Sequence, residues 1–362
     1  MSICMVEYQG RCDEALKAVG HSPKVLEEYY GYIKDLDKVS VLAPETILKD
    51  ASLEIKEKSS TLPHYILMKS GNSFLEKIAN KKYMFDNISN ALKKSDADTL
   101  WFFNVEFYFW LYMAFHSTKK RIVVTSFIGG FGGGFVGKIK QRIFEKAQKR
   151  IALIIGSGKN FEFKNCVSSY IPDYVFQKEK YEKYLSVKKQ KRAVVLGTMG
   201  SDKQLEQLIA QFSKINYPLL IAGRFYDKDW FEECKRKSTP NITVTDKYIS
   251  DEEYLKLLSE SEYAILPYSR EKYGKQTSGV LQEAMFLNTV PVAFGEVLSA
   301  SNVSGKSIEA YEELTDEFFN EPVAAYTEKL TERRDSDFSE AVIRDRYKQI
   351  FRNDMVHIKD VL

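Results

Sequence analysis

The chain has few of the residues that build metal sites and disulfide frameworks. Its 362 residues include only four cysteines and four histidines, and no two cysteines have the Cys-x-x-Cys spacing. Cysteines scattered in this way favour a reducing compartment and argue against a disulfide framework or a zinc site. We therefore expect a cytoplasmic protein that holds no metal.

Long hydrophobic runs are also scarce. The first six residues lack the basic start and the apolar run of a signal peptide. The most apolar stretch, residues 100–115, is short for a membrane span and is interrupted by Asn104 and Glu106. We interpret it as a strand followed by a buried helix, with a membrane-dipping segment as the alternative.

An excess of charge of one sign is missing as well. The sequence has 53 basic and 50 acidic residues, a formal net charge of +3. This balance gives no support to nucleic-acid binding. A hydrophobic share of 44% and a charged share of 28% are typical of a globular protein, and the length favours two domains.

Short apolar runs alternate with helical patterns along the whole chain. Ser22-Pro23 is a good start for a helix that extends to about residue 36. Alternation of strand and helix predicts parallel sheets covered on both faces. In the first half we expect strands at residues 3–8, 38–43, 64–68, 99–103, 121–126 and 150–155.

Residues 177–192 are rich in charged residues and poor in apolar ones, a composition that is typical of a linker. We therefore predict an N-terminal Rossmann-like domain at residues 1–176, a second one at 193–338, and a C-terminal helix within 339–362 that crosses back to the first. The strands expected in the second domain are residues 193–197, 218–222, 241–245, 262–266 and 290–294. The helices expected there are residues 202–213 and 251–260.

Residues 265–293 carry the most specific pattern, a buried strand, a polar loop, a short helix and a second strand. The helix begins near Ser278-Gly279, after Thr277, and continues through Val280. A helix start offers free backbone N–H groups and the positive end of a dipole, which suits a diphosphate. Glu283 lies one turn further along, where a carboxylate can accept hydrogen bonds from ribose hydroxyls.

This run resembles the donor site of retaining GT-B glycosyltransferases of family 4, in the variant with a Thr-Ser-Gly loop. The resemblance implies two doubly wound Rossmann-like domains facing a central cleft, and a nucleotide-sugar as donor. The family usually carries two glutamates separated by seven residues. Glu283 matches the second, whereas Lys275 stands in place of the first. An ordinary strand–helix–strand unit is the alternative interpretation of this run.

The resemblance extends to other loops of the second domain. Lys203 has the family's spacing from Gly197, although Thr198 replaces the usual Arg, and Arg224 is a substitute source of positive charge. Lys203, Arg224 and Glu283 are therefore the candidate catalytic residues. The candidate donor-binding residues are Gly10, Gly197, Thr198, Tyr248, Ile249, Tyr268, Thr277, Ser278, Gly279 and Val280.

The first domain matches the family only in its layout. Arg11 follows the first strand and Asn104 and Glu106 follow another, so we place them on the acceptor side together with Gly130 of a glycine-rich loop. Phe127 stands where the family often has a histidine, and His21 and His116 are the nearby substitutes. Gly132, Gly134 and Gly137 satisfy the G-x-G-x-x-G pattern of dinucleotide sites, which is weak evidence by itself.

We accordingly expect a glycosyltransferase that moves a sugar, with retention and without metal, to a glycan or a lipid-linked acceptor. We expect UDP, rather than GDP or dTDP, as the nucleotide of the sugar donor. A non-catalytic GT-B subunit and an NAD(P)-dependent oxidoreductase are the alternatives. Association into a homo-oligomer or with a partner glycosyltransferase stays open.

Residues 138–150 form a basic, amphipathic segment, to which Lys119-Lys120-Arg121 adds further charge. Such a face is attracted to anionic lipid headgroups, which would place the protein peripherally at the inner face of the membrane. A solvated helix face is the alternative. We expect Phe131 and Phe135 to be exposed beside it.

Overall fold

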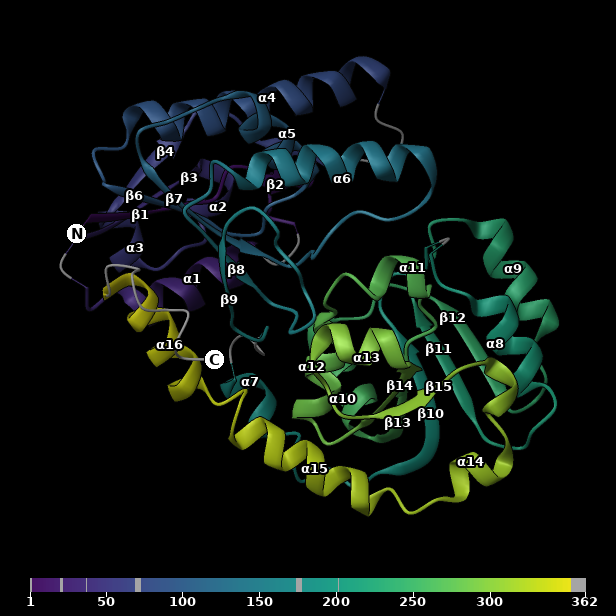
Figure 1. Cartoon of the computed structure of the whole chain (residues 1–362). Coiled ribbons are helices and arrows are strands. Elements are labelled where there is room, and N and C mark those ends of the chain that lie inside the picture. The colour runs from purple at the N-terminus through teal and green to yellow at the C-terminus, as the bar shows by residue number, and fades with distance from the viewer. Residues whose placement is uncertain are drawn as a thin grey trace. The chain divides into compact units, whose positions relative to one another are not determined.

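The structure is a computed structural model that describes residues 2–19, 22–36, 38–68, 73–173, 178–200 and 202–352. It divides into two compact units, each with its own parallel sheet (Figure 1). Unit 1 comprises Met1–Ser157, Phe161–Ile171 and Glu340–Leu362, and unit 2 comprises Gly158–Asn160 and Pro172–Ser339.

Within the described residues, the main sheet of unit 1 has seven parallel strands in the order β4-β3-β1-β6-β7-β8-β9. These strands are β1 (Ser2–Val6), β3 (Lys38–Pro44), β4 (Ser59–Leu62), β6 (Thr99–Phe102), β7 (Arg121–Ser126), β8 (Leu153–Gly156) and β9 (Val167–Tyr170). A separate small sheet pairs β2 (Arg11–Cys12) with β5 (Ile66–Leu67).

Helices cover both faces of this sheet. The helices of unit 1 are α1 (Ser22–Ile33), α2 (Glu45–Leu48), α3 (Leu53–Glu57), α4 (Phe74–Lys94), α5 (Phe107–Phe115), α6 (Gly134–Gln148) and α16 (Glu340–Arg352). The C-terminal helix α16 belongs to unit 1 because its aromatic side chains pack on the sheet and on α1. Tyr347 stacks on Tyr32, and Phe351 lies 4.9 Å from Trp101, centroid to centroid.

Within the described residues, the sheet of unit 2 has six parallel strands in the order β12-β11-β10-β13-β14-β15. These strands are β10 (Gln190–Leu196), β11 (Leu219–Gly223), β12 (Ile242–Asp246), β13 (Ser261–Ile265), β14 (Val290–Phe294) and β15 (Lys306–Ile308). The helices of unit 2 are α7 (Glu179–Glu182), α8 (Leu205–Phe212), α9 (Lys228–Lys237), α10 (Asp251–Ser259), α11 (Arg270–Tyr273), α12 (Gly279–Phe286), α13 (Gly295–Ser301), the 3-10 helix η1 (Tyr311–Glu313), α14 (Asp316–Asn320) and α15 (Ala324–Asp335).

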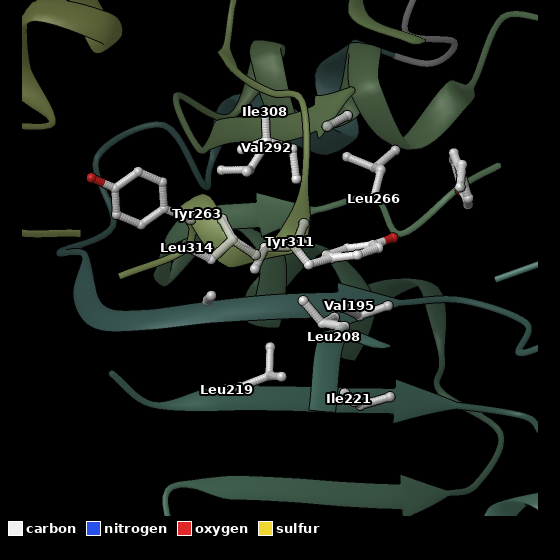
Figure 2. Close-up of a cluster of buried hydrophobic side chains, with 14 of the residues drawn as sticks. Val195, Leu208, Leu219, Ile221, Tyr263, Leu266, Val292, Ile308, Tyr311 and Leu314 are labelled. Atoms are coloured by element: carbon white, nitrogen blue, oxygen red, sulfur yellow. The ribbon is translucent and has the colours of Figure 1, made fainter. Parts of the chain in front are cut away.

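Apolar side chains on one face of the β10–β15 sheet form the larger core of unit 2 (Figure 2). Val195, Ile221 and Val292 come from three strands, and Leu208 of α8 and Tyr311 of η1 pack against the same cluster. Each fully buried side chain of this size contributes about 1.5–3 kcal/mol. The rigidity of this core fixes where the strands end, and therefore where the loops of the site begin.

The doubly wound α/β architecture predicted from the sequence is present in both units. The predicted strands 121–126 and 290–294 match β7 and β14 residue for residue. The strand expected at 64–68 is shorter, since only Ile66 and Leu67 pair, and that expected at 150–155 begins at Leu153. The apparent linker at 177–192 has structure of its own, because it contains α7 and the start of β10; its residue 177 lies outside the described part of the chain.

Candidate active site

The strand order of unit 2 defines one point at which a ligand is expected. From β10 the chain proceeds outward to β11 and β12, then returns to β13 on the other side of β10. The loops that follow β10 and β13 therefore leave in opposite directions and open a crevice at the carboxyl edge of the sheet. All the donor-side candidates except Gly10 lie in unit 2, on the loops and helices that follow its strands, and Gly10 lies in unit 1.

Two glycines shape this edge. Gly197 follows β10 with φ +96°, and a Cβ atom built on it would point into open space. Gly223 ends β11 with φ +151°, and a Cβ there would lie 1.7 Å from the carbonyl oxygen of Gly197. Only glycine allows the two loops to approach this closely. Gly197 was predicted as a site residue, whereas Gly223 was missed because its role depends on a contact between separate strands.

The helix expected to begin near Ser278 and Gly279 is α12, which begins at Gly279. Ser278 occupies the N-cap position and its N–H donates to Oγ of Ser301 at 3.1 Å, while Thr277 and Ser278 are both buried. A Cβ on Gly279 would meet nothing within 4 Å, so a ligand atom has room beside the backbone. Partial positive charge at such a helix start favours a phosphate oxygen.

Glu283, one turn into α12, is held by two tyrosines. Its Oε1 accepts a hydrogen bond from the hydroxyl of Tyr181 at 3.0 Å, and its Oε2 accepts one from Tyr254 at 2.5 Å. Burial and the neighbouring Glu283 carboxylate raise the pKa of both phenols, so both stay protonated donors. Sequence reasoning missed both tyrosines, and Tyr181 is separated from Glu283 by 102 residues.

Lys203 is buried in the segment between β10 and α8. Its Nζ donates to the carbonyl oxygen of Leu196 at 3.1 Å and lies 3.6 Å from Sδ of Met199. Burial lowers the pKa of Lys203 to about 8, with Asp202 opposing this shift. The ammonium group thus points along the strand end in this structure, and contact with a diphosphate requires its side chain to turn outward.

The loops after β10 and β13 are tied together. Lys203 and Tyr268 form a backbone bridge, and the ring of Tyr268 stacks on Tyr273 at 3.9 Å between centroids. The hydroxyl of Tyr273 donates to Asp202 at 2.7 Å, and Lys272 donates to the same carboxylate oxygen at 2.9 Å. Burial raises the pKa of Tyr268 to about 12. Tyr268 is therefore buried and held in place by Lys203 and Tyr273.

The catalytic candidate Arg224 and the remaining donor-binding candidates lie just after β10, β11 and β12. Thr198 and Arg224 are exposed, and Tyr248 is the most exposed large aromatic residue of the part of the chain that the structure describes. Ile249 packs against the smaller core of unit 2. Tyr226, which the sequence reasoning did not single out, is exposed beside Arg224. These side chains offer a cation and two aromatic faces, which suit a phosphate and a base.

Unit 1 has its own crevice point, between β1 and β6 in the strand order. The sequence-predicted acceptor residues Arg11 and Glu106 meet there, since Nη2 of Arg11 lies 2.6 Å from Oε2 of Glu106. The carbonyl oxygen of Asn104 accepts a hydrogen bond from Nε2 of Gln9 at 2.8 Å. Gly10, with φ +59°, packs against Pro44 so closely that a Cβ would clash with it.

Glu7 directly follows β1 and was missed by the sequence reasoning. It is fully buried and accepts from the N–H groups of Gln9 and Gly10 and from Oγ of Ser22. Burial raises the pKa of Glu7, while the two backbone N–H bonds lower it. Gln9 is also fully buried, and its Oε1 has no hydrogen-bond partner within the described residues. A hydroxyl-bearing ligand would satisfy such an oxygen.

The glycine-rich loop before α6 is shaped by packing. Gly130 is buried against Gln141, whose Oε1 accepts a hydrogen bond from the N–H of Phe131 at 2.8 Å. A Cβ on Gly137 would lie 2.1 Å from the carbonyl oxygen of Gly132. The expected exposure of Phe131 is wrong, because its ring packs against Phe107 at 5.5 Å and against the core of unit 1.

The histidine candidate that the structure describes, His116, does not lie among the acceptor-side residues. His116 lies at the C-terminal end of α5, where its ring stacks on Tyr112 at 4.0 Å and Nδ1 contacts the carbonyl oxygen of the same residue. This end of α5 is remote from Glu106, which precedes the helix. His21 lies outside the described residues.

At least one aspartate of each Asp-x-Asp triplet in the described part of the chain has a structural role. Asp98 accepts from Ser2, Asp227 caps α9, and Asp337 pairs with Arg333. Within the described ranges, three Asp-x-Asp triplets occur, at residues 96–98, 227–229 and 335–337. No group of three His, Cys, Asp or Glu side chains there is arranged to hold a metal ion. Over the same ranges, every helix is too short or too polar to cross a bilayer.

Comparison with solved structures identifies the fold. The chain is similar to sucrose-phosphate synthase from Thermosynechococcus elongatus, with a TM-score of 0.67, 13% identity and coverage of 97% of this chain and 98% of that one. It is similar to HepE from Anabaena in complex with UDP and glucose, with a TM-score of 0.65, 12% identity and coverage of 97% and 99%.

A UDP-forming trehalose-phosphate synthase from Burkholderia xenovorans has a TM-score of 0.61, 10% identity and coverage of 98% and 100%. The chain has the GT-B fold, with two Rossmann-like sets of parallel strands matched over almost its full length. No model of a known protein family matches the sequence, and no curated protein matches it either.

Proposed function

We propose that this chain is a glycosyltransferase that uses a nucleoside diphosphate sugar as donor. The observation that carries the proposal is the coincidence, at the crevice of unit 2, of the open start of α12, the bare backbone of Gly197 and the carboxylate of Glu283. The diphosphate binds the N–H groups at Gly279 and Val280, and Glu283 accepts from the ribose. Similarity to GT-B glycosyltransferases, including one in complex with UDP and glucose, supports this assignment.

The leaving diphosphate must be neutralised for transfer to proceed. In this proposal the helix dipole, Arg224 and an outward-turned Lys203 supply the positive charge, so no metal is required. The sugar is transferred with retention, and UDP is the expected carrier. Tyr248 and Ile249 contact the base, and Tyr268 closes one wall of the site.

The acceptor is proposed to bind at the crevice of unit 1. Arg11, Asn104 and Glu106 offer a paired cation, an amide and a carboxylate, which suit the hydroxyl groups of a glycan. Glu7 and Glu106 are both acidic and Arg11 is already paired, so the local charge does not favour a phosphorylated acceptor. A glycan or lipid-linked acceptor, reached in the cytoplasm at the inner face of the membrane, fits this site.

Thermal-shift screening against UDP-, GDP- and dTDP-sugars tests the proposal, followed by calorimetry on the best ligand and product analysis with glycan acceptors. We expect UDP-sugars to raise the melting temperature and activity to persist in EDTA. Activity lost in EDTA and restored by Mn²⁺ would refute the charge neutralisation described above. Failure of every nucleotide to bind would refute the donor site itself.

A non-catalytic GT-B subunit is a second candidate, favoured by one specific observation. The two oxygens of Glu283 already accept from Tyr181 and Tyr254, and Lys203 is turned toward Leu196. Nucleotide binding without turnover, for any acceptor presented in solution or on vesicles, would favour this alternative. A partner glycosyltransferase would then supply the missing activity.

A further inference from the structure

The N-terminal ends of α4 and α6 expose apolar side chains in an unusual concentration. Phe74 and Leu75 on α4 are both 76% exposed, and Phe135 and Val136 on α6 are 79% and 64% exposed. Ile78 and Ile139, one turn further along each helix, are also exposed. Six large apolar side chains thus point to solvent from the first two turns of these two helices.

The two helix ends lie at the same end of unit 1, because both helices run parallel to α5. Near the start of α5, Tyr108 lies under Lys81 of α4 and Phe107 lies under Lys140 of α6. Near its end, Phe115 lies 4.1 Å from the ammonium of Lys146, later in α6. The later turns of α4 line a hollow with the end of α5, at residues that include Phe85, Leu92, Tyr112 and Phe115. Figure 1 shows α4 and α6 alongside each other over the sheet.

Basic residues surround the apolar tips. The first nine residues of α4 contain three lysines, Lys77, Lys81 and Lys82, and one acidic residue, Glu76, which is engaged in capping the helix. The first nine residues of α6 contain Lys138, Lys140 and Arg142 and no acidic residue. Both helix starts also present the positive end of a dipole.

We propose that these two helix ends, hereafter the α4/α6 tip, bind the surface of an anionic lipid bilayer. Apolar and aromatic side chains insert among the acyl chains, and lysines on both helices contact lipid phosphates. An anionic bilayer fits the pattern of side chains on these helix ends. Their exposed apolar residues match the apolar interior of the bilayer, and the six basic residues beside them match its negatively charged surface.

The position of the α4/α6 tip relates it to the acceptor residues. Lys140 lies 5.2 Å from the centre of the Phe107 ring, and Phe107 directly follows Glu106, the partner of Arg11. A bilayer held at the tip would therefore lie next to the crevice of unit 1. Delivery of an acceptor from the bilayer to that crevice rests on the proposed function, whereas vesicle binding does not.

Vesicle flotation of the full chain tests the inference. Vesicles of equal parts phosphatidylglycerol and phosphatidylcholine should bind the protein at low salt, and phosphatidylcholine alone should not. The Phe74→Ser, Phe135→Ser double variant and the Lys77→Glu, Lys138→Glu double variant should each weaken binding at least about tenfold, given that one basic residue contributes about fivefold.

Matched controls come from the same unit. Leu53→Ser removes an apolar side chain that is 72% exposed on α3, and the Lys94→Glu, Lys149→Glu double variant reverses charges at the opposite ends of α4 and α6. Both controls should bind vesicles like the wild type. An equal loss of vesicle binding in the tip and control variants would overturn the inference, as would a wild type that does not bind anionic vesicles.

Calorimetry with UDP distinguishes this failure from failure of the proposed function. Tip variants that lose vesicle binding should keep the UDP affinity of the wild type, because the α4/α6 tip belongs to unit 1 and the nucleotide crevice to unit 2. Vesicle binding without UDP binding would support the α4/α6 tip and count against the donor site. UDP binding without vesicle binding would do the reverse.

Discussion

The hydroxyl of Tyr254 lies 2.5 Å from Oε2 of Glu283, so a phenol of α10 holds the carboxylate that α12 presents at the crevice of unit 2. Because burial raises the pKa of Tyr254, the proton stays on the phenol and the carboxylate is the acceptor. A carboxylate has about four acceptor positions, so a ribose hydroxyl can share Glu283 with the tyrosines. The hydrogen bonds from Tyr181 and Tyr254 therefore orient Glu283, the residue on which donor binding is proposed to depend.

Replacement of Glu283 tests this role directly. Glu283→Gln should weaken nucleotide binding by about 1–3 kcal/mol, the range for loss of a hydrogen bond to a charged group. Isothermal titration calorimetry with UDP measures the change, and circular dichroism confirms that the variant is folded. Glu252→Gln, on the exposed face of α10, serves as the control and should bind like the wild type. Unchanged affinity in folded Glu283→Gln would exclude the ribose contact.

The buried Lys203 should make stability depend on pH in a defined window. Its pKa in the folded protein is about 8, below the 10.5 of the unfolded chain, because burial penalises the ammonium form. Between these values the unfolded state binds more protons, so stability rises with pH. Relative to Lys203→Met, the wild type should gain about 3 kcal/mol from pH 7 to above pH 10.5, at 1.36 kcal/mol per pKa unit.

Urea denaturation of the wild type and Lys203→Met across this pH range measures the difference in stability, in which the contributions of other titrating groups cancel.

Lys189→Met is the control for the role of Lys203 in UDP binding, since burial also lowers the pKa of Lys189, to about 7. Lys189 precedes β10 and donates to Leu287 and Thr289, at the opposite edge of the sheet from Lys203. We expect Lys203→Met alone to weaken UDP binding; equal weakening in both variants would show that Lys203 has no specific contact with the diphosphate.

The fold could be predicted from the sequence wherever a strand is a continuous apolar run in the middle of a sheet. β7 and β14 are buried on both faces, and their apolar patterns gave the correct bounds. The edge strand β12 was predicted one residue early, from its run Ile-Thr-Val-Thr. The edge strands β4 (Ser-Ser-Thr-Leu), β9 (Val-Ser-Ser-Tyr) and β15 (Lys-Ser-Ile) were missed, since they are short and mostly polar. Such strands depend on backbone pairing to one neighbour, which leaves little trace in hydrophobic periodicity.

The candidate site was predictable where it depends on local chain geometry. The start of α12 and the position of Glu283 follow from residues 277–283, and Arg11 and Glu106 follow from their places after strands. Tyr181 and Gly223 were not predictable in this way. Tyr181 lies in a charged segment that reads as a linker, and the requirement for glycine at 223 comes from the carbonyl of Gly197. Both depend on contacts between distant segments.

Gly223 should tolerate no side chain. In Gly223→Ala the new Cβ would meet the carbonyl oxygen of Gly197 at 1.7 Å, at a φ of +151° that L-residues rarely adopt. We expect a loss of about 3 kcal/mol or more in the free energy of unfolding. Gly31→Ala in α1 is the control, since its Cβ would meet nothing within 4 Å; it should stabilise by about 0.5–1 kcal/mol. Similar stabilities for the two variants, measured by urea denaturation, would contradict the close approach of the two loops.

The ion pair of Arg11 and Glu106 should matter to the acceptor far more than to stability. Both side chains are about one-third exposed, so the pair contributes at most about 1 kcal/mol to folding. Glu106→Gln keeps the shape of the side chain but leaves Arg11 without its charged partner. We expect an unfolding free energy within about 1 kcal/mol of the wild type, an unchanged Kd for UDP, and a KM for the acceptor raised about tenfold or more, as for a lost charged hydrogen bond.

Lys34→Gln, which breaks the exposed pair with Glu54 on the same unit, is the control and should leave that KM unchanged. Initial rates at varied acceptor and fixed, saturating donor give the decisive comparison. If Glu106→Gln changes only the Kd for UDP, the crevice between β1 and β6 belongs to the donor, and the acceptor must bind elsewhere.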